Sequence, residues 1–402
     1  MEKTVCELFA GVGGFRLGLE RASKEWETVF FSQWEPGKTK QWAHDCYVSH
    51  FGDINENTGI DIALVDKNTI ADHNLLVGGF PCQDYSVAHS LNGEKGIEGK
   101  KGVLWWQIRD TLIVKQPPFV LLENVDRLLK SPSKQRGRDF GIILACFAEL
   151  GYSVEWRVLN ASEYGNAQRR RRTYIFAYKN STKYAFNINK YEAIEIIQNR
   201  GFFGTTFPIQ KVNHRDIKYD AFTSYNLELI SNKYKCEFEN TGYMINGRIY
   251  TIKTFPVLEA PIPLRQIVEQ NAPEEFYISD EKMPKWRYMK GAKKIERIAQ
   301  TGFRYTFSEG SIAFPDSLDL PARTMLTSEA TLNRSSHVIE DPATRRLRLI
   351  TPLEAERLQG FDDNWTNTGM PQKFRYFCMG NALVVPLVTR MGITLNTIFE
   401  NE

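Results

Sequence analysis

The chain has 402 residues, of which 42% are hydrophobic and 25% charged, so it is long enough for two or three domains with buried cores. The net charge of +3 neither requires nor excludes an acidic partner, and six scattered cysteines without a CxxC pair or clustered histidines argue against a disulfide framework and a metal site. No apolar stretch has membrane-spanning length and no signal-peptide pattern opens the chain, so we expect a cytoplasmic protein that does not enter a membrane.

The first 179 residues alternate between strand and helix patterns. Short apolar runs predict strands, and apolar residues at helical spacing predict helices between them. The expected strands are residues 5–9, 28–32, 75–77, 119–122, 154–159 and 173–178, and the expected helices are residues 15–23, 103–114 and 140–150. This alternation predicts an α/β fold with a mostly parallel sheet that is covered on both faces.

The pattern changes after residue 179. Residues 180–320 show short runs, scattered Asn and Gly, and few clear helices, which indicates a separate domain of irregular or β structure. Residues 375–398 return to helical spacing, and we expect this tail to pack back on the first domain.

A glycine turn follows the first expected strand. Gly11, Gly13 and Gly14 would let the backbone approach a ligand closely, and the following helix N-terminus suits polar or anionic groups. Arg16 stands where a dinucleotide fingerprint has its third glycine, which disfavours a dinucleotide oxidoreductase. Glu35 follows the second strand, where such folds bind ribose hydroxyls.

Three later segments supply candidate reactive groups at strand ends. Cys82 follows Pro81 after a short apolar run; a lone cysteine more often packs in a core, but a thiol at a sheet edge is also a strong nucleophile. Glu123 ends another apolar strand, where partial desolvation would raise its pKa and suit it to proton donation. Arg170 and Arg172 stand two residues apart before the last strand, so alternation would point both toward one side, to hold a carbonyl oxygen or a phosphate.

A basic segment interleaved with aromatic residues lies between residues 282 and 304. This mixture suits a polyphosphate that also offers bases for stacking, although a solvated helix face would have a similar composition. The basic residues are Lys282, Lys285, Arg287, Lys290, Lys293, Lys294, Arg297 and Arg304, and the aromatic ones are Trp286, Tyr288 and Phe303.

Taken together, these segments resemble the cytosine-C5 DNA methyltransferases, in particular those of bacterial type II restriction-modification systems. The resemblance runs from residue 5 to about residue 390 in the family's order, and it leaves out only residues 180–320, where the family varies. The matching segments are residues 9–15 (Phe-Ala-Gly-Val-Gly-Gly-Phe), 79–83 (Gly-Phe-Pro-Cys-Gln), 123–125 (Glu-Asn-Val), 168–172 (Gln-Arg-Arg-Arg-Arg), 322–324 (Ala-Arg-Thr) and 380–382 (Gly-Asn-Ala).

The resemblance implies a Rossmann-like methyltransferase domain with a smaller, irregular and β-rich target-recognition domain. The implied domains are residues 1–179 for catalysis and cofactor binding, 180–320 for target recognition, 321–374 for a hinge, and 375–402 for a helix that returns to the catalytic domain. The implied activity is sequence-specific: a methyl group passes from S-adenosylmethionine, leaving S-adenosylhomocysteine, to C5 of a flipped-out cytosine. The expected partner is double-stranded DNA, bound by a monomer without a metal ion.

The resemblance also implies a role for each site residue. Cys82 would add to cytosine C6, Glu123 would bind N3 and the exocyclic amine, Arg172 would bind O2, and Arg170 would support the cysteine loop and a nearby phosphate. The expected cofactor-binding residues are Phe9, Gly11, Gly13, Gly14, Glu35, Asp61, Ile62, Pro81, Asn381 and Ala382. The expected DNA-binding residues are Gln83, Ser86, Lys100, Lys101, Lys290, Lys293, Lys294, Arg304 and Arg323.

The sequence departs from the family's pattern at three positions. Pro36 follows Glu35 where a bulkier residue usually covers the adenine, Ala382 replaces a frequent serine, and Glu7 replaces a frequent aspartate. Two alternatives stay open at this point: a transfer-RNA cytosine-C5 methyltransferase, and a catalytically silent DNA-binding relative. The long variable region favours DNA over RNA, and the presence of all four candidate catalytic residues argues against a silent relative.

Overall fold

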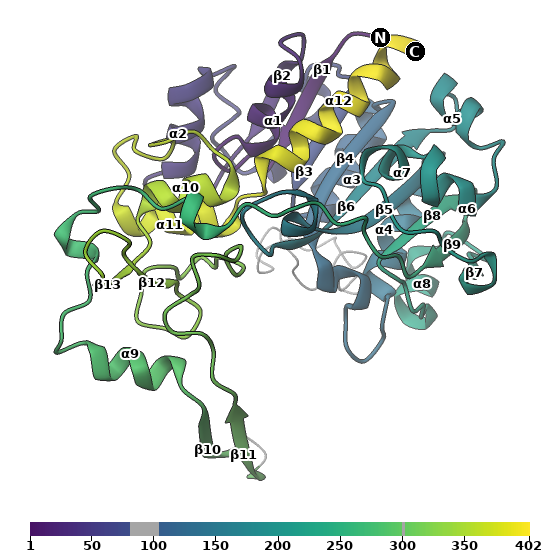
Figure 1. Ribbon diagram of the computed structural model, residues 1–402. Coiled ribbons are helices and arrows are strands. Elements are labelled where there is room, and N and C mark those ends of the chain that lie inside the picture. The colour runs from purple at the N-terminus through teal and green to yellow at the C-terminus, as the bar shows by residue number, and fades with distance from the viewer. Residues whose placement is uncertain (81–103, 300–301) are drawn as a thin grey trace. The chain divides into compact units, whose positions relative to one another are not determined.

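The computed structural model describes residues 1–80, 104–299 and 302–402, and these form two compact units. The first unit comprises Met1–Tyr164, Arg171–Glu259 and Leu383–Glu402. The second comprises Gly165–Arg170 and Ala260–Ala382. The predicted α/β class is confirmed by the large mixed sheet of the first unit (Figure 1).

That sheet has nine strands in the order β2-β1-β3-β4-β6-β5-β8-β9-β7. The pairs among β2, β1, β3 and β4 are parallel, and every later pair is antiparallel, so the expectation of a mostly parallel sheet is wrong. Only residues 161–170 connect β5 with β6, whereas a parallel crossover needs a dozen or more residues. The strands are β1 (Thr4–Leu8), β2 (Glu27–Ser32), β3 (Leu75–Gly79), β4 (Phe119–Val125), β5 (Tyr152–Asn160), β6 (Arg171–Lys179), β7 (Lys218–Ala221), β8 (Thr241–Ile245) and β9 (Arg248–Ile252).

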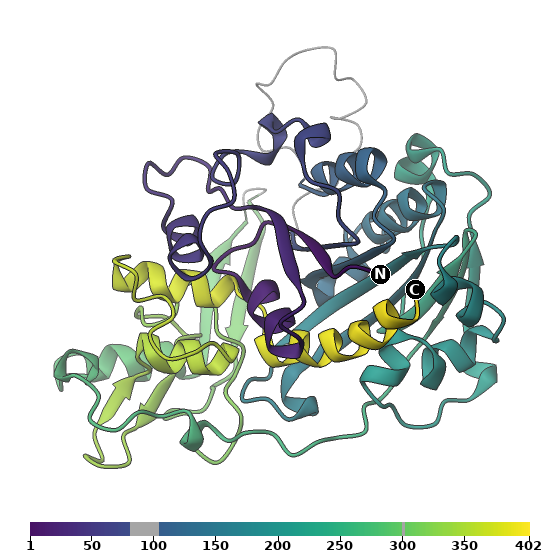
Figure 2. The same ribbon diagram turned by 90° about the horizontal axis from the view of Figure 1, so that it is seen from above.

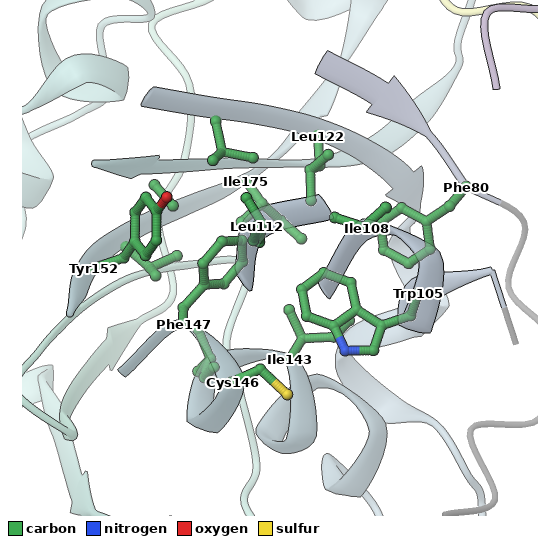
Figure 3. Packing of buried hydrophobic residues seen from close by; sticks show 14 of the residues in the cluster. Phe80, Trp105, Ile108, Leu112, Leu122, Ile143, Cys146, Phe147, Tyr152 and Ile175 are labelled. Atoms are coloured by element: carbon green, nitrogen blue, oxygen red, sulfur yellow. The ribbon is translucent and has the colours of Figure 1, made fainter. Parts of the chain in front are cut away.

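Helices cover both faces of this sheet. Successive side chains of a strand point to opposite faces, and successive residues of β4 are buried, so both faces must be covered. On β4, Leu122 faces a cluster that includes Trp105 of α3 (Trp105–Lys115) and Phe147 of α4 (Arg138–Glu149), shown in Figure 3. Phe119 faces the opposite side, where its ring centroid lies 5.1 Å from that of Phe399 in α12 (Val385–Asn401). The strands therefore read as continuous apolar runs because both faces are buried.

The chain's last helix, yellow in Figures 1 and 2, packs against α1 (Gly14–Ala22) of the first unit. Small residues allow this close approach: a Cβ atom on Gly18 would lie 2.6 Å from a side-chain carbon of Val388. A Cβ atom on Gly392 would likewise lie 2.7 Å from the Cβ atom of Ala22. A larger residue at either glycine would push α12 away from α1.

The boundary expected at residue 180 differs from the structure. Residues 180–259, expected in the target-recognition domain, belong to the first unit because β8, β9 and β7 continue its sheet beyond β5. The remaining helices of this unit are α2 (Trp42–Phe51), α5 (Lys183–Ile188), α6 (Ala193–Glu195), α7 (Phe202–Thr206) and α8 (Leu227–Lys233).

In the described residues of the second unit there are two separate two-stranded sheets and three α-helices. The sheets pair β10 (Lys293–Ile298) with β11 (Arg304–Glu309), and β12 (Val338–Glu340) with β13 (Leu347–Leu349); the helices are α9 (Met283–Lys290), α10 (Pro352–Gln359) and α11 (Gln372–Asn381). Among the described residues, no single helix has the length and apolarity to cross a bilayer; the bent pair α11 and α12 meets those criteria only when taken together.

Candidate functional site

The carboxyl ends of the parallel strands meet at one edge of the first unit's sheet. Leu8 of β1 pairs with Ser32 of β2 on one side and with Gly78 of β3 on the other. Gly79 then pairs with Glu123 of β4. This register brings four chain segments to the edge at which open α/β sheets bind ligands.

The glycine turn after β1 is shaped for a ligand. Gly13 has a φ of +88°, and a Cβ atom there would lie 2.4 Å from a ring atom of Phe51, so only glycine fits. Gly11 has a φ of +58°, yet a Cβ atom there would meet no atom within 4 Å. The space beside Gly11 is therefore open, while its N–H is held by the Gln33 side-chain oxygen at 2.7 Å. No sequence pattern predicts this role of Gln33.

Glu35 supplies a hydrogen-bond acceptor at the end of β2. Its Oε2 atom is buried and accepts no hydrogen bond from the described residues, and burial raises the pKa of this carboxyl group despite the nearby charge of Lys38. The loop that carries Glu35 is held by Gln41, whose amide accepts from the Glu35 N–H at 2.7 Å and donates to the Lys38 carbonyl at 2.8 Å. A buried acceptor without a donor fits a ligand hydroxyl, such as one of a ribose.

Three further cofactor candidates, Phe9, Asp61 and Ile62, belong to the first unit. Phe9 directly follows β1 with a φ of +58°, and its half-buried ring packs against the main core cluster. Asp61 uses one carboxylate oxygen to accept from the Ala63 N–H at 3.0 Å, and the other makes no hydrogen bond with the described residues. Ile62 is 3% exposed and contributes to the core.

Glu123 and Arg172 form an ion pair at the same edge. The Arg172 Nε atom lies 2.8 Å from a Glu123 carboxylate oxygen, and the two side chains are 17% and 11% exposed. Their register explains the contact: Glu123 pairs with Tyr174 and Val125 with Arg172, so both side chains occupy one face on the diagonal of the β4–β6 pair. The structure thus brings together two of the predicted catalytic residues.

Asn124 connects this strand to the chain that leads toward Cys82. Its side-chain amide donates to the Phe80 carbonyl at 2.8 Å, and its side-chain oxygen accepts from the Val125 N–H at 2.8 Å. The sequence alone predicts no separate role for Asn124, although it stands beside Glu123. Six predicted site residues, namely Pro81, Cys82, Gln83, Ser86, Lys100 and Lys101, lie outside the described residues.

Arg170 belongs to the second unit, where it is 1% exposed. Its guanidinium donates to the carbonyl oxygens of Met325 at 3.1 Å and Gly380 at 2.9 Å. Because β6 begins only at Arg171, the expected alternation of Arg170 and Arg172 along one strand is wrong. A guanidinium buried against two carbonyls ties chain segments together, and this burial does not fit the expected phosphate contact.

The predicted DNA-binding residues of the second unit separate into two groups. Lys290 is 1% exposed and donates to the carbonyls of Arg334 and Ser336, and Arg323 forms two hydrogen bonds with the Asp316 carboxylate, so both cations have partners within the second unit and their DNA contacts stay predictions. The Lys293 side chain is 9% exposed, with its Nζ atom 4.5 Å from the Tyr288 ring centroid. Lys294 and Arg304, in contrast, are exposed.

Asn381 and Ala382 lie at the C-terminal end of α11 in the second unit. Asn381 is exposed and Ala382 half-buried, and their assignment to the cofactor stays a prediction. Within the described residues, no group of three or more His, Cys, Asp or Glu side chains is arranged to hold a metal ion.

Known proteins resemble this chain over most of its length. A family model described as C-5 cytosine-specific DNA methylase matches residues 3–396. The type II methyltransferase M.Sau3AI of Staphylococcus aureus is 50% identical over 98% of this chain and 95% of its own length. The type II methyltransferase M.HhaI of Haemophilus parahaemolyticus is 36% identical over 43% of this chain and 48% of its own.

Solved structures share the fold at low sequence identity. The Entamoeba histolytica methyltransferase EhMeth superposes with a TM-score of 0.60 at 15% identity, covering 100% of this chain and 99% of that one. The S. pombe Dnmt2 methyltransferase superposes with a TM-score of 0.59 at 15% identity, covering 99% of this chain and 98% of that one. At this identity the likeness concerns the fold alone.

Proposed function

The chain belongs to the C-5 cytosine-specific DNA methylase family and is a DNA (cytosine-5)-methyltransferase, and from this premise we propose which of its residues carry the reaction. The observation that carries the proposal is the Glu123–Arg172 ion pair at the carboxyl end of β4. It lies beside Gly79, which pairs with Glu123, and beside Phe80, which Asn124 holds. The chain continues from Phe80 to the proposed nucleophile, Cys82.

The reaction requires a nucleophile and an acid because cytosine C5 is itself a poor nucleophile. The Cys82 thiolate adds to C6, forming an S–C6 bond and moving electron density toward C5 and N3. C5 then takes up the methyl group and water removes the C5 proton. The electron pair of that C5–H bond re-forms the C5=C6 double bond as the S–C6 bond breaks, which releases the Cys82 thiolate and 5-methylcytosine. Glu123 hydrogen-bonds N3 and the exocyclic amine, so that it stabilises the charge that develops in the ring.

Arg172 has two tasks in this proposal. Its Nε atom holds the Glu123 carboxylate in one orientation, and its Nη1 atom donates to the Arg171 carbonyl at 2.8 Å, so we assign the Nη2 donors to the cytosine O2. A charged pair with little exposure to water acts more strongly on a bound base than an exposed pair would. Arg170 keeps a positioning role, because its donors are engaged by carbonyls of the second unit.

S-adenosylmethionine is the proposed cofactor, and it would supply an electrophilic methyl group. The described residues fit it: Glu35 offers a buried acceptor for ribose hydroxyls, and the open space beside Gly11 leaves room for the ligand. Phe9 would contact the adenine and Asp61 its amine, with Ile62 beside them. Pro81, Asn381 and Ala382 complete the set by resemblance to the family.

The proposed substrate is double-stranded DNA, from which the target cytosine must be flipped out at a cost of about a few kcal/mol. We place the reaction in the bacterial cytoplasm, where a monomer acts on DNA. The relative from Staphylococcus aureus, a type II methyltransferase, supports this setting.

The test measures transfer of a labelled methyl group from S-adenosylmethionine to duplex DNA and, in parallel, to transfer RNA. The wild-type chain should label cytosine C5 in DNA, and Cys82→Ala should abolish transfer while DNA and cofactor binding persist. Cys236→Ala, at a half-buried cysteine remote in sequence, is the matched control and should keep its activity. Full methylation by Cys82→Ala, or a preference for transfer RNA, would contradict the proposal.

A further inference from the structure

The β10–β11 pair of the second unit is an isolated ribbon. Its six residue pairs run from Lys293 opposite Glu309 to Ile298 opposite Arg304, and no third strand joins it within the described part of the chain. In Figure 1 it extends beyond α9, apart from β12 and β13 of the same unit. Two-stranded ribbons are marginally stable in water, so a surface that covers one face would stabilise this one.

The two faces of the ribbon differ in exposure. Side chains alternate along each strand, so directly paired residues share a face. On the inner face Lys293, Ile295, Phe307 and Glu309 are half-buried, whereas the pair Arg297 and Tyr305 is exposed. The Arg297 guanidinium lies 4.1 Å from the Phe307 ring centroid. On the outer face every residue is exposed: Lys294, Glu296, Ile298, Arg304, Thr306 and Ser308.

The polar groups of the outer face are available to a partner. Lys294, Glu296 and Arg304 form no ion pair or side-chain hydrogen bond with the residues that the structure describes, and neither do Thr306 and Ser308. The inner face differs, because Glu309 there lies 4.0 Å from Lys293 and 3.9 Å from Arg334. The outer face therefore presents cationic, anionic and hydroxyl groups that have no side-chain partner among the described residues.

Hydrogen bonds hold both chain segments at the attached end of the ribbon. The guanidinium of Arg334 donates to the carbonyl of Gly291, which precedes β10, and to that of Gly310, which follows β11. Lys290 in turn donates to the Arg334 carbonyl at 3.0 Å, and burial lowers the pKa of Lys290 to about 8. These cations hold the start of β10 and the end of β11, so the outer face is a preformed surface rather than a loose loop.

The charge of the segment indicates the class of partner. Residues 282–309 contain eight Lys or Arg and two Glu, a net charge of +6 (8 − 2), against +3 for all 402 residues. The remainder of the chain is thus net acidic, and the basic charge gathers around this ribbon. Such a local excess attracts a polyanion.

We propose that the outer face of the β10–β11 ribbon enters the major groove of the DNA and reads bases next to the target cytosine. The major groove admits a two-stranded ribbon. The side chains suit base edges, because arginine donates to guanine O6 and N7, a carboxylate accepts from cytosine N4, and a hydroxyl can do either. The base contacts come from Arg304, Glu296 and Thr306. The phosphate contacts come from Lys294 and Ser308, which lie nearer the attached end of the ribbon. This inference rests on the proposed function, since it assumes a DNA substrate.

The experiment compares site preference between variants on a duplex library with randomised sequence. Preference is measured by sequencing the methylated cytosines, and independently by selecting bound duplexes with each substitution placed in the Cys82→Ala background. Arg304→Ala and Glu296→Ala should each lower discrimination at one base-pair position by roughly 5- to 150-fold, the range expected for loss of one base contact. Lys24→Ala, an exposed lysine of the first unit, is the control and should leave preference unchanged.

A second variant separates base contact from charge. Arg304→Lys keeps the charge but loses the forked donor geometry, so discrimination should fall while the salt dependence of DNA affinity stays as in the wild type. Unchanged preference in Arg304→Ala and Glu296→Ala would overturn the ribbon proposal, even with normal methylation. A wild-type chain that methylates no duplex would instead contradict the proposed function.

Discussion

The Nε atom of Arg172 lies 2.8 Å from a carboxylate oxygen of Glu123, on one face of the β4–β6 pair. Both side chains are mostly removed from water, at 17% and 11% exposure. A carboxylate in such a place depends on its cation, because removing one partner leaves the other charge poorly solvated. The pair therefore sets the orientation of Glu123 before any base arrives.

Replacing Arg172 with alanine should reduce the rate of methyl transfer. The variant loses both the cation that orients Glu123 and the donors proposed for cytosine O2, so kcat should fall by about 10²- to 10³-fold, as for loss of a donor to a developing charge. The measurement is single-turnover transfer at saturating DNA and cofactor.

The neighbouring arginine provides the control for this prediction. Arg171 lies on the other face of β6 and pairs with Asp126 at 3.2 Å, with both side chains about half exposed at 56% and 44%. Exposed pairs contribute little, so Arg171→Ala should change stability by less than about 1 kcal/mol. Equal losses of kcat in the two variants would show that the Glu123 contact has no special role.

Asn124→Asp should lower activity through the chain segment that precedes Cys82. The substitution keeps the shape of the side chain. It replaces the amide nitrogen, which lies 2.8 Å from the Phe80 carbonyl oxygen, with a carboxylate oxygen that cannot donate to that carbonyl. An unsatisfied buried group costs about 1–3 kcal/mol, so the free energy of unfolding should fall by that amount and kcat should fall as well. Urea unfolding and transfer assays check both. Normal kcat in a destabilised variant would mean that Asn124 is structural only.

The sequence predicted the first six strands because each is an apolar run buried on both faces. The glycine turn was also predictable. Only glycine fits at position 13, because the backbone there has a positive φ and the Phe51 ring approaches too closely for a Cβ atom. Strands β7, β8 and β9 were missed because residues 180–259 lack the alternation of strand and helix patterns, although β8 and β9 continue the same sheet. For β5 and β6 the positions were predicted, but not their antiparallel pairing, which follows from the short connection between them.

The burial and the partners of individual charged side chains were much less predictable. Lys290 looks like its neighbour Lys294 in the sequence, yet Lys290 is buried against carbonyls of residues 334 and 336 while Lys294 is exposed. Arg170 and Arg172 likewise share one motif and have different partners. The partners that decide burial come from distant parts of the chain, and local composition carries no information about them.

Glu35→Gln should weaken cofactor binding while sparing the chemical step. The substitution replaces one buried acceptor with an amide donor and removes the charge, so a hydrogen bond to a ligand hydroxyl worth about 1.5–3 kcal/mol is lost. The Kd for S-adenosylmethionine should rise by roughly 10- to 150-fold, with kcat at saturation nearly unchanged. Calorimetric titration provides the measurement, with Glu27→Gln, exposed at the start of β2, as the control. An unchanged Kd would remove Glu35 from the cofactor site.

Glu7 should make the stability of the chain depend on pH. It is fully buried, its carboxylate accepts from the Tyr47 hydroxyl at 3.0 Å, and burial raises its pKa from 4.5 to about 7. Between these two values the folded chain keeps a proton that the unfolded chain has lost. The free energy of unfolding should therefore fall as pH rises through this window, by up to about 1.4 kcal/mol per pH unit from this group.

The Glu7→Gln variant isolates this effect, because glutamine stays neutral at every pH and removes the proton difference between the folded and unfolded chains. Urea unfolding at pH 5 and at pH 7.5 should show a smaller loss of stability for Glu7→Gln than for the wild type. Glu27→Gln, with its exposed side chain, should follow the wild type. If Glu7→Gln loses as much stability as the wild type between the two pH values, then Glu7 is already ionised at pH 5 in the folded chain.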